Sequence, residues 1–119
     1  MIAITLNKGF QLFFDNGFGV SVQIGAEDLC SNNDSSKEYN YELNNLSLVT
    51  CKNAEFAVLK GTRENFDLVR VFDGGQADTD GWVSAEKIAV FIGAVAIAKS
   101  EADLKNYFKE NYKNRGSKP

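Results

Sequence analysis

The sequence predicts an α+β fold, in which an antiparallel β-meander of about five strands carries two C-terminal α-helices packed on the sheet. Apolar and polar residues alternate through most of the first 72 residues, as they do in half-buried strands. An Asn16-Gly17 pair joins two of these alternating stretches, which is a strong hairpin signal. From Ser84 onward the apolar residues follow a helical period instead. Strands first and helices last is the order of an α+β domain.

The first elements are three short strands, which we place at residues 2–6, 10–15 and 18–25. Residues 7–9 break the chain between the first two strands, and the Asn16-Gly17 turn joins the second to the third. In the third strand Phe18 shares one face with the valines that follow it. Phe13 interrupts the polar face of the second strand. We therefore take Phe13 and Phe18 as candidate interface residues.

The middle of the chain begins with a polar stretch at residues 26–45, which predicts a long loop. Such a loop in a compact domain is either functional or disordered, and both readings stay open. Three further strands are expected, at residues 46–50, 54–60 and 66–72. Residues 61–65 form the turn between the last two. A glycine- and aspartate-rich loop is expected at 73–81.

Two helices close the domain. Ser84 is a suitable N-cap for the first, and Glu86 lies in its first turn, where the helix dipole favours negative charge. Gly93 is expected to allow close packing of this helix against the sheet. Ser100 caps the second helix, with Asp103 three residues later in an acidic variant of the capping box. We assign residues 1–113 to a single domain and 114–119 to a frayed tail.

Composition limits the chemistry. The 119 residues include no histidine, which removes Ser-His and Cys-His catalysis and most catalytic zinc sites. Cys30 and Cys51 are the only cysteines, and we expect both to be free, with a disulfide as the alternative in an oxidising setting. No signal peptide and no membrane span are expected, so we place the protein in the cytoplasm. We expect no enzymatic activity.

The aspartate-rich loop resembles a calcium-binding loop only in part. If Gly81 is aligned with the turn glycine of an EF-hand, Gln76 takes the first ligand position and Lys87 takes that of the bidentate glutamate. Gly74-Gly75 raises the possibility of a phosphate cradle, but no complete phosphate-binding motif surrounds it. We predict neither a metal nor a cofactor.

Charge is distributed unevenly along the chain. Residues 1–98 carry 7 lysines and arginines against 13 aspartates and glutamates, whereas residues 99–119 carry 6 against 3. Because residues 1–98 carry a negative net charge, we do not expect a nucleic acid as the partner.

A basic stripe is the first candidate binding site. Lys105, Lys109 and Lys113 lie four residues apart on the second helix, and Arg115 extends them. The alternative is a solvated helix face. Tyr107 and Tyr112 lie close enough to add stacking, unless they belong to the core. Trp82 is the only tryptophan, and it is either a lid on the core or a binding residue.

Several segments together resemble a group of small proteins encoded by tailed phages and prophages. They are the hairpin Phe14-Asp15-Asn16-Gly17-Phe18, the strand Val20-Ser21-Val22-Gln23-Ile24-Gly25, the cysteine at position 30, the stretch from Cys51 to Val58, and the helix entry Gly81-Trp82. The resemblance covers about three-quarters of the chain. It implies a phage origin and carries no activity or site residues with it.

Three functions follow as hypotheses. The first is a small phage accessory protein that inhibits a host or anti-phage defence factor by stoichiometric binding in the host cytoplasm. The second is an oligomeric sponge that sequesters a nucleotide-like small molecule through the basic stripe and a stacking aromatic. The third is a virion or structural assembly protein that uses the Phe13 and Phe18 region. A homo-oligomer is compatible with each of them.

Overall fold

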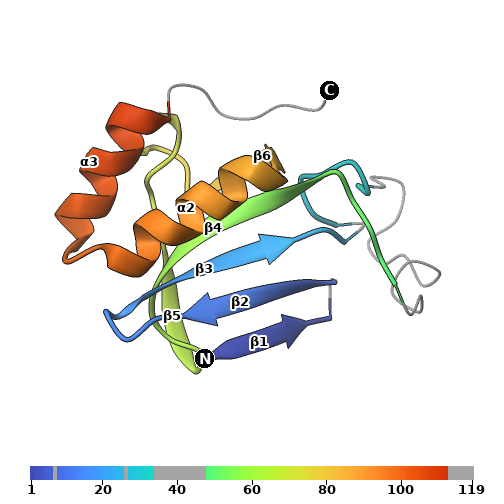
Figure 1. The fold of residues 1–119 in the computed structure, drawn as a ribbon, viewed down its shortest axis with the longest axis horizontal. Coiled ribbons are helices and arrows are strands. Elements are labelled where there is room, and N and C mark those ends of the chain that lie inside the picture. The colour runs from blue at the N-terminus through green and yellow to red at the C-terminus, as the bar shows by residue number, and fades with distance from the viewer. Residues whose placement is uncertain (7, 26, 34–47, 113–119) are drawn as a thin grey trace.

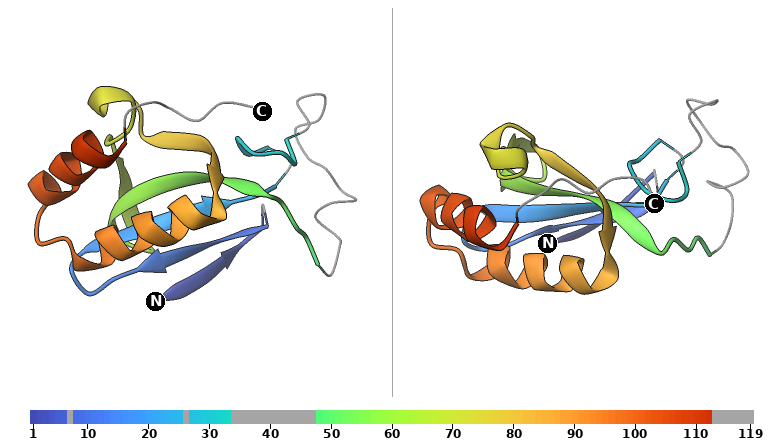
Figure 2. Two further views of the ribbon diagram at one scale, coloured as in Figure 1. Left: turned by 45° about the horizontal axis from the view of Figure 1, so that its top comes forward. Right: turned by 90° about the horizontal axis from the view of Figure 1, so that it is seen from above.

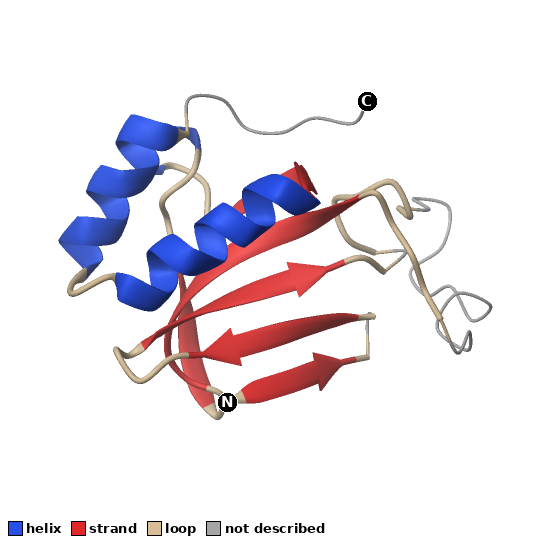
Figure 3. Ribbon diagram, in the orientation of Figure 1, coloured by secondary structure: helices blue, strands red, loops and turns tan. Residues whose placement is uncertain are grey.

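The computed structural model describes residues 1–6, 8–25, 27–33 and 48–112, and the statements below concern these residues. They form six strands, a short 3-10 helix and two α-helices (Figure 1; Figure 3). The elements are β1 (Ile2–Thr5), β2 (Gly9–Phe13), β3 (Phe18–Gln23), β4 (Asn53–Thr62), β5 (Asn65–Val69), η1 (Asp73–Gly75), β6 (Thr79–Ser84), α2 (Ala85–Ile97) and α3 (Glu101–Asn111).

The strands form one antiparallel sheet in the order β1-β2-β3-β4-β5, with β6 also paired to β4. β4 is ten residues long, so one of its edges accommodates two partners. β5 pairs with residues 58–62 of β4, and β6 pairs with residues 53–57. Figure 2 shows α2 lying along one face of the sheet and α3 at one end of it. The predicted α+β meander with two C-terminal helices is confirmed.

Two predicted elements were wrong. The expected loop at 73–81 contains η1 and the first half of β6. Thr79-Asp80-Gly81 has no apolar alternation, and it becomes a strand because β4 offers a free edge there. Of the strand expected at 46–50, only 48–50 is described, and these residues form no strand. Both edges of β4 are already occupied, and Leu48 is 76% exposed.

The remaining differences are smaller. The strand expected at 66–72 ends at Val69, after which Phe72 makes a single bridge to Ala77. Most of the polar stretch at 26–45 lies outside the described residues. Its described part, 27–33, makes turns that pack beside β6, where the Leu29 carbonyl accepts a hydrogen bond from the Trp82 backbone N–H at 2.8 Å.

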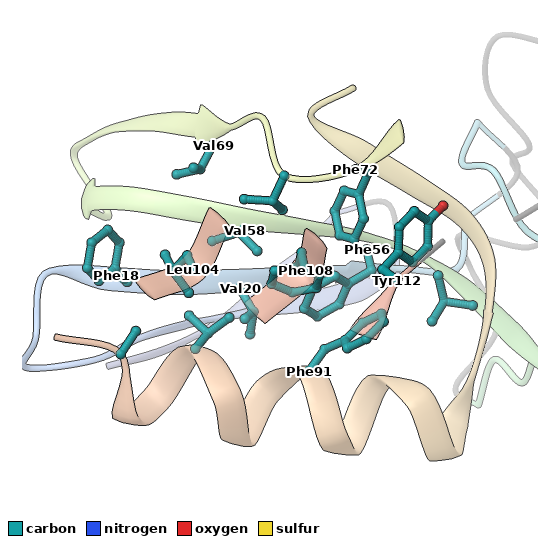
Figure 4. Close-up of a cluster of buried hydrophobic side chains, with 14 of the residues drawn as sticks. Phe18, Val20, Phe56, Val58, Val69, Phe72, Phe91, Leu104, Phe108 and Tyr112 are labelled. Atoms are coloured by element: carbon teal, nitrogen blue, oxygen red, sulfur yellow. The ribbon is translucent and has the colours of Figure 1, made fainter. Parts of the chain in front are cut away.

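The main core lies between the sheet and the two helices. Figure 4 shows aromatic rings from four separate segments meeting there. Phe72 is one of the two central rings, and its centroid lies 5.1 Å from that of Phe108, 5.1 Å from that of Tyr112 and 6.1 Å from that of Phe56. Phe91 contacts the same group from α2. Such edge-to-face contacts add to the free energy of burying the rings.

Phe13 and Phe18 do not lie on an exposed assembly surface, which corrects the expectation for both. Phe18 is 6% exposed and belongs to the main core. Phe13 is 9% exposed and packs on the opposite face of the sheet, where its ring meets that of Phe66 beside the buried Leu59. The strand pattern correctly placed Phe13 opposite the main core, but it did not reveal the second cluster that covers it.

Both helices begin where the capping residues predict. The Ser84 hydroxyl accepts a hydrogen bond from the Lys87 backbone N–H, and the Ser100 hydroxyl accepts one from that of Asp103. The prediction for Gly93 was wrong. α2 packs through Phe91 and Val95, whereas Gly93 is exposed, and a Cβ added there would have no neighbour within 4 Å.

Asn16 joins the first hairpin to the end of α2. Its side-chain oxygen accepts a hydrogen bond from the Phe18 backbone N–H at 3.0 Å, which shapes the turn. Its Nδ2 group donates to the carbonyls of Val95 and Ala98, each at 2.9 Å. The last carbonyls of a helix have no partners within the helix, so this side chain caps α2 from a distant part of the sequence.

Replacing Asn16 should therefore destabilise the protein through α2 as well as through the turn. We expect Asn16→Ala to lower the free energy of unfolding by about 1.5 kcal/mol. Asn16→Asp keeps the acceptor for Phe18 but removes the donors and places a negative charge at a helix C-terminus. It should be at least as destabilising as alanine in urea unfolding. A fully stable aspartate variant would show that the contact to α2 contributes nothing.

Candidate functional site

A cleft of about 680 Å³ lies between α3 and the chain that follows β5. Cationic side chains, two consecutive glycines and the edges of core aromatic residues line it. The lining residues are Arg70, Val71, Gly74, Gly75, Lys105, Phe108, Lys109 and Tyr112.

α3 supplies one wall and much of the floor. Lys105 and Lys109 lie one helical turn apart, so both face the cleft, and both are exposed. Phe108 lies between them in sequence and is fully buried, with its ring packed on Phe72. Tyr112 follows the helix, and its hydroxyl donates a hydrogen bond of 2.8 Å to the buried Asp80 carboxylate. The floor is therefore apolar and held in place by the core.

The opposite wall is a left-handed turn. Asp73, Gly74 and Gly75 have φ values of 52°, 67° and 87°. Residues other than glycine rarely adopt positive φ values, which explains why two consecutive glycines occur here. Backbone hydrogen bonds to the Phe72 carbonyl from Gly75 and from Ala77, each at 3.0 Å, close the turn. Arg70, exposed and just beyond β5, adds a third cation to the lining.

Positive charge dominates the rim of the cleft in a chain whose net charge is −3. Lys105 is partly neutralised, because its Nζ lies 3.2 Å from a Glu101 carboxylate oxygen. Lys60 contacts the same carboxylate at 3.3 Å, and hydrogen bonds from Lys105 and Lys60 hold the pKa of Glu101 below its usual value. Arg70 and Lys109 form no salt bridge with the described residues. The cleft thus offers cations to an anionic ligand.

The predicted binding residues are only partly brought together. Lys105 and Lys109 line the cleft, whereas Lys113 and Arg115 lie outside the described residues. Tyr107 borders a separate, shallower hollow between α2 and α3, and Tyr112 takes the place beside the lysines.

Trp82 lies away from the cleft, in β6. It has a φ of 50° at an irregularity in the pairing with β4, and its indole Nε1 is buried without an acceptor in the described part of the chain.

Arg70 is the charged cleft residue that sequence reasoning missed, whereas Tyr112 was one of the two tyrosines expected near the stripe. Nothing in the sequence links an arginine after β5 to a helix that begins some 30 residues later. Gly74-Gly75 was a visible signal, but it matched no phosphate-binding motif. Only the structure shows that this glycine pair lines the same cleft as the lysines of α3.

The two cysteines are free thiols, as expected. Burial raises the pKa of Cys30 to about 12, so this thiol is a poor nucleophile. In the described part of the chain, no cluster of three or more acidic, cysteine or histidine residues is placed to hold a metal. No helix within the described ranges is both long and apolar enough to cross a membrane.

Comparison with known proteins adds no relative: no protein-family model, curated protein or solved structure matches the chain.

Proposed function

We propose that this protein is a non-enzymatic binding protein, and that its ligand is a nucleotide-like small molecule held in the α3 cleft. The observation that supports this most directly is the convergence of Arg70, Lys105 and Lys109 over an apolar floor. A cleft of about 680 Å³ falls within the range of small-molecule sites.

The two parts of the cleft suit the two parts of such a ligand. The cations would pair with phosphate oxygens, and Arg70 presents a planar group suited to bidentate contacts. The edges of Val71 and Tyr112 that reach the cleft would lie against a flat apolar group such as a base. Gly74 and Gly75 present backbone without side chains, which allows a ligand to approach closely.

Calorimetric titration with ATP, inorganic triphosphate and adenosine tests the proposal. We expect ATP to bind more tightly than either fragment, because only ATP engages both the rim and the floor. The double variant Lys105→Gln, Lys109→Gln should weaken ATP binding by about a hundredfold, since each charge-assisted contact contributes about 1.5 kcal/mol or more. Added salt should weaken binding to the wild type more than to the variant.

The matched control is Lys52→Gln, Lys87→Gln. It changes the net charge by the same amount at exposed lysines that do not line the cleft. We expect its affinity for ATP to equal that of the wild type. Equal losses in both double variants would mean that ATP responds to overall charge and not to a site, and the proposal would then be wrong.

The alternative of a stoichiometric inhibitor of a host or defence protein makes a different prediction. Native mass spectrometry of the protein captured gently from lysate separates the two. An added mass of a few hundred daltons, lost in the cleft variant, supports the sponge. A second polypeptide in fixed ratio, retained in the cleft variant, supports the inhibitor and identifies its target.

A further inference from the structure

β1 is an edge strand with an unusual surface. It pairs with β2 on one side, and no described residue pairs with its other edge. Ile2 and Ile4 are 74% and 82% exposed, and Leu6, just after the strand, is 92% exposed. Figure 1 shows that β1 lies at the margin of the sheet, beyond the part covered by α2. An uncharged, apolar edge is uncommon, because such edges template unwanted pairing.

The two outer edges of the sheet differ in this respect. β5, at the other margin, carries an exposed aspartate, Asp67, and is followed by the exposed Arg70. Charges of this kind are the ordinary protection of an edge strand. Residues 2–6 contain none. The protection found at β5 is therefore missing at β1.

The ladder shows which backbone groups of β1 point outward. Met1 and Phe13 exchange both hydrogen bonds, at 2.8 and 2.9 Å. Bonded and non-bonded pairs alternate along an antiparallel ladder, so Ala3 and Thr5 also bond to β2. The N–H and C=O groups of Ile2 and Ile4 consequently point to the free edge. The hydrogen bond from the Ile24 N–H to the Lys8 carbonyl fixes the same alternation on the far side of β2.

This arrangement is self-complementary. An antiparallel copy of β1 related by a two-fold axis at Ile4 places Ile4 opposite Ile4 as a bonded pair. The same axis places Ile2 opposite Leu6 and Ala3 opposite Thr5. All the outward-pointing groups then find partners, and the exposed isoleucines form one stripe across the junction. A second copy of β1 can therefore pair with the outward-pointing N–H and C=O groups of the first. No charged side chain of residues 2–6 has to be buried at the junction.

We propose that β1 pairs with β1 of a second copy, which joins two six-stranded sheets into one continuous sheet in a symmetric dimer. This interface is separate from the α3 cleft, so a result that contradicts the dimer leaves the proposed ligand site untouched, and the reverse also holds. The exposed face of Ile2 and Ile4 continues the row formed by their partners Leu12 and Phe10, which pack on the main core.

Sedimentation velocity over a range of protein concentrations tests the proposal. We expect the wild type to form a dimer that dissociates on dilution. Ile4→Lys places two ammonium groups together at the axis and should weaken association by at least about tenfold. Ile4→Pro removes only an outward N–H, so the β1–β2 ladder survives while the dimer is lost. Ile4→Val and Leu68→Lys, an edge change on β5, should leave the dimer intact.

Hydrogen exchange of the backbone amides gives a second readout. In the dimer the amides of Ile2 and Ile4 should exchange slowly, and they should become fast on dilution while that of Ala3 stays protected by β2. A wild type that is monomeric throughout, with fast Ile2 and Ile4 amides, would overturn the proposal and leave the edge to a strand from another protein. A dimer unaffected by Ile4→Lys and Ile4→Pro would equally overturn it.

Discussion

Phe72→Ala is expected to lower the free energy of unfolding by about 4 kcal/mol, as truncation of fully buried aromatic residues does. Phe72 has no exposed surface, and its ring meets those of Phe56, Phe91 and Phe108 from three other segments. The loss includes the cavity left behind, because rings held by a sheet and two helices cannot collapse into it. Urea unfolding measures the change directly.

Leu68→Ala is the matched control for this prediction. Leu68 lies four residues earlier and is 41% exposed, so its truncation should change the free energy of unfolding by about 0.5 kcal/mol or less. If Phe72→Ala proves too unstable to purify, Phe72→Leu should show an intermediate loss. Equal effects at positions 68 and 72 would contradict the aromatic cluster as the centre of the core. Because Phe72 packs behind Phe108 and Tyr112, its truncation should also weaken any ligand bound in the cleft.

Asp28→Asn is expected to stabilise the protein at neutral pH. Asp28 is 6% exposed, and desolvation raises its pKa from 3.8 to about 6, while the hydrogen bond from the Gly25 backbone N–H opposes the shift. A carboxyl whose pKa is raised by folding favours the folded state while it is protonated. Its contribution is full below pH 3.8 and is lost as the pH rises through about 6. A shift of this size corresponds to about 3 kcal/mol.

The comparison of wild type and Asp28→Asn across pH isolates this one group. The wild type should lose stability relative to the variant between about pH 4 and pH 7, and the difference should then level off. Asparagine keeps the acceptor for the Gly25 N–H, and its amide can donate to Glu55, the neighbouring carboxylate. Glu27→Gln, which removes an exposed charge next in sequence, should show little of the effect. A difference in the free energy of unfolding between wild type and Asp28→Asn that does not change with pH would contradict the prediction.

Local patterns were sufficient for most of the architecture. Period-two alternation in β3 placed Val20 and Val22 in the core, and the Asn-Gly pair marked the first hairpin. Ser84 and Ser100 fixed the starts of the helices, because an N-cap depends only on a side chain and the backbone three residues later. These features are short-range, so a single sequence is enough to predict them.

The same reasoning failed wherever a partner distant in sequence decided the outcome. β6 lacks alternation and exists because β4 is long enough to pair twice. The strand pattern alone placed Phe13 on a polar, exposed face. In the structure Phe66 and Leu59 cover it on the face of the sheet opposite the main core.

The candidate site divides in the same way. The sequence showed a basic stripe on one helix and a pair of glycines, which are both local patterns. Only the tertiary structure decided that Lys105 and Lys109 face Gly74 and Arg70 across a cleft, and that Tyr112 and not Tyr107 lies beside them. The angle at which α3 packs on the core sets that choice. It follows from how Leu104 and Phe108 fit the rings beneath them, a property of many contacts at once that no single stretch of sequence contains.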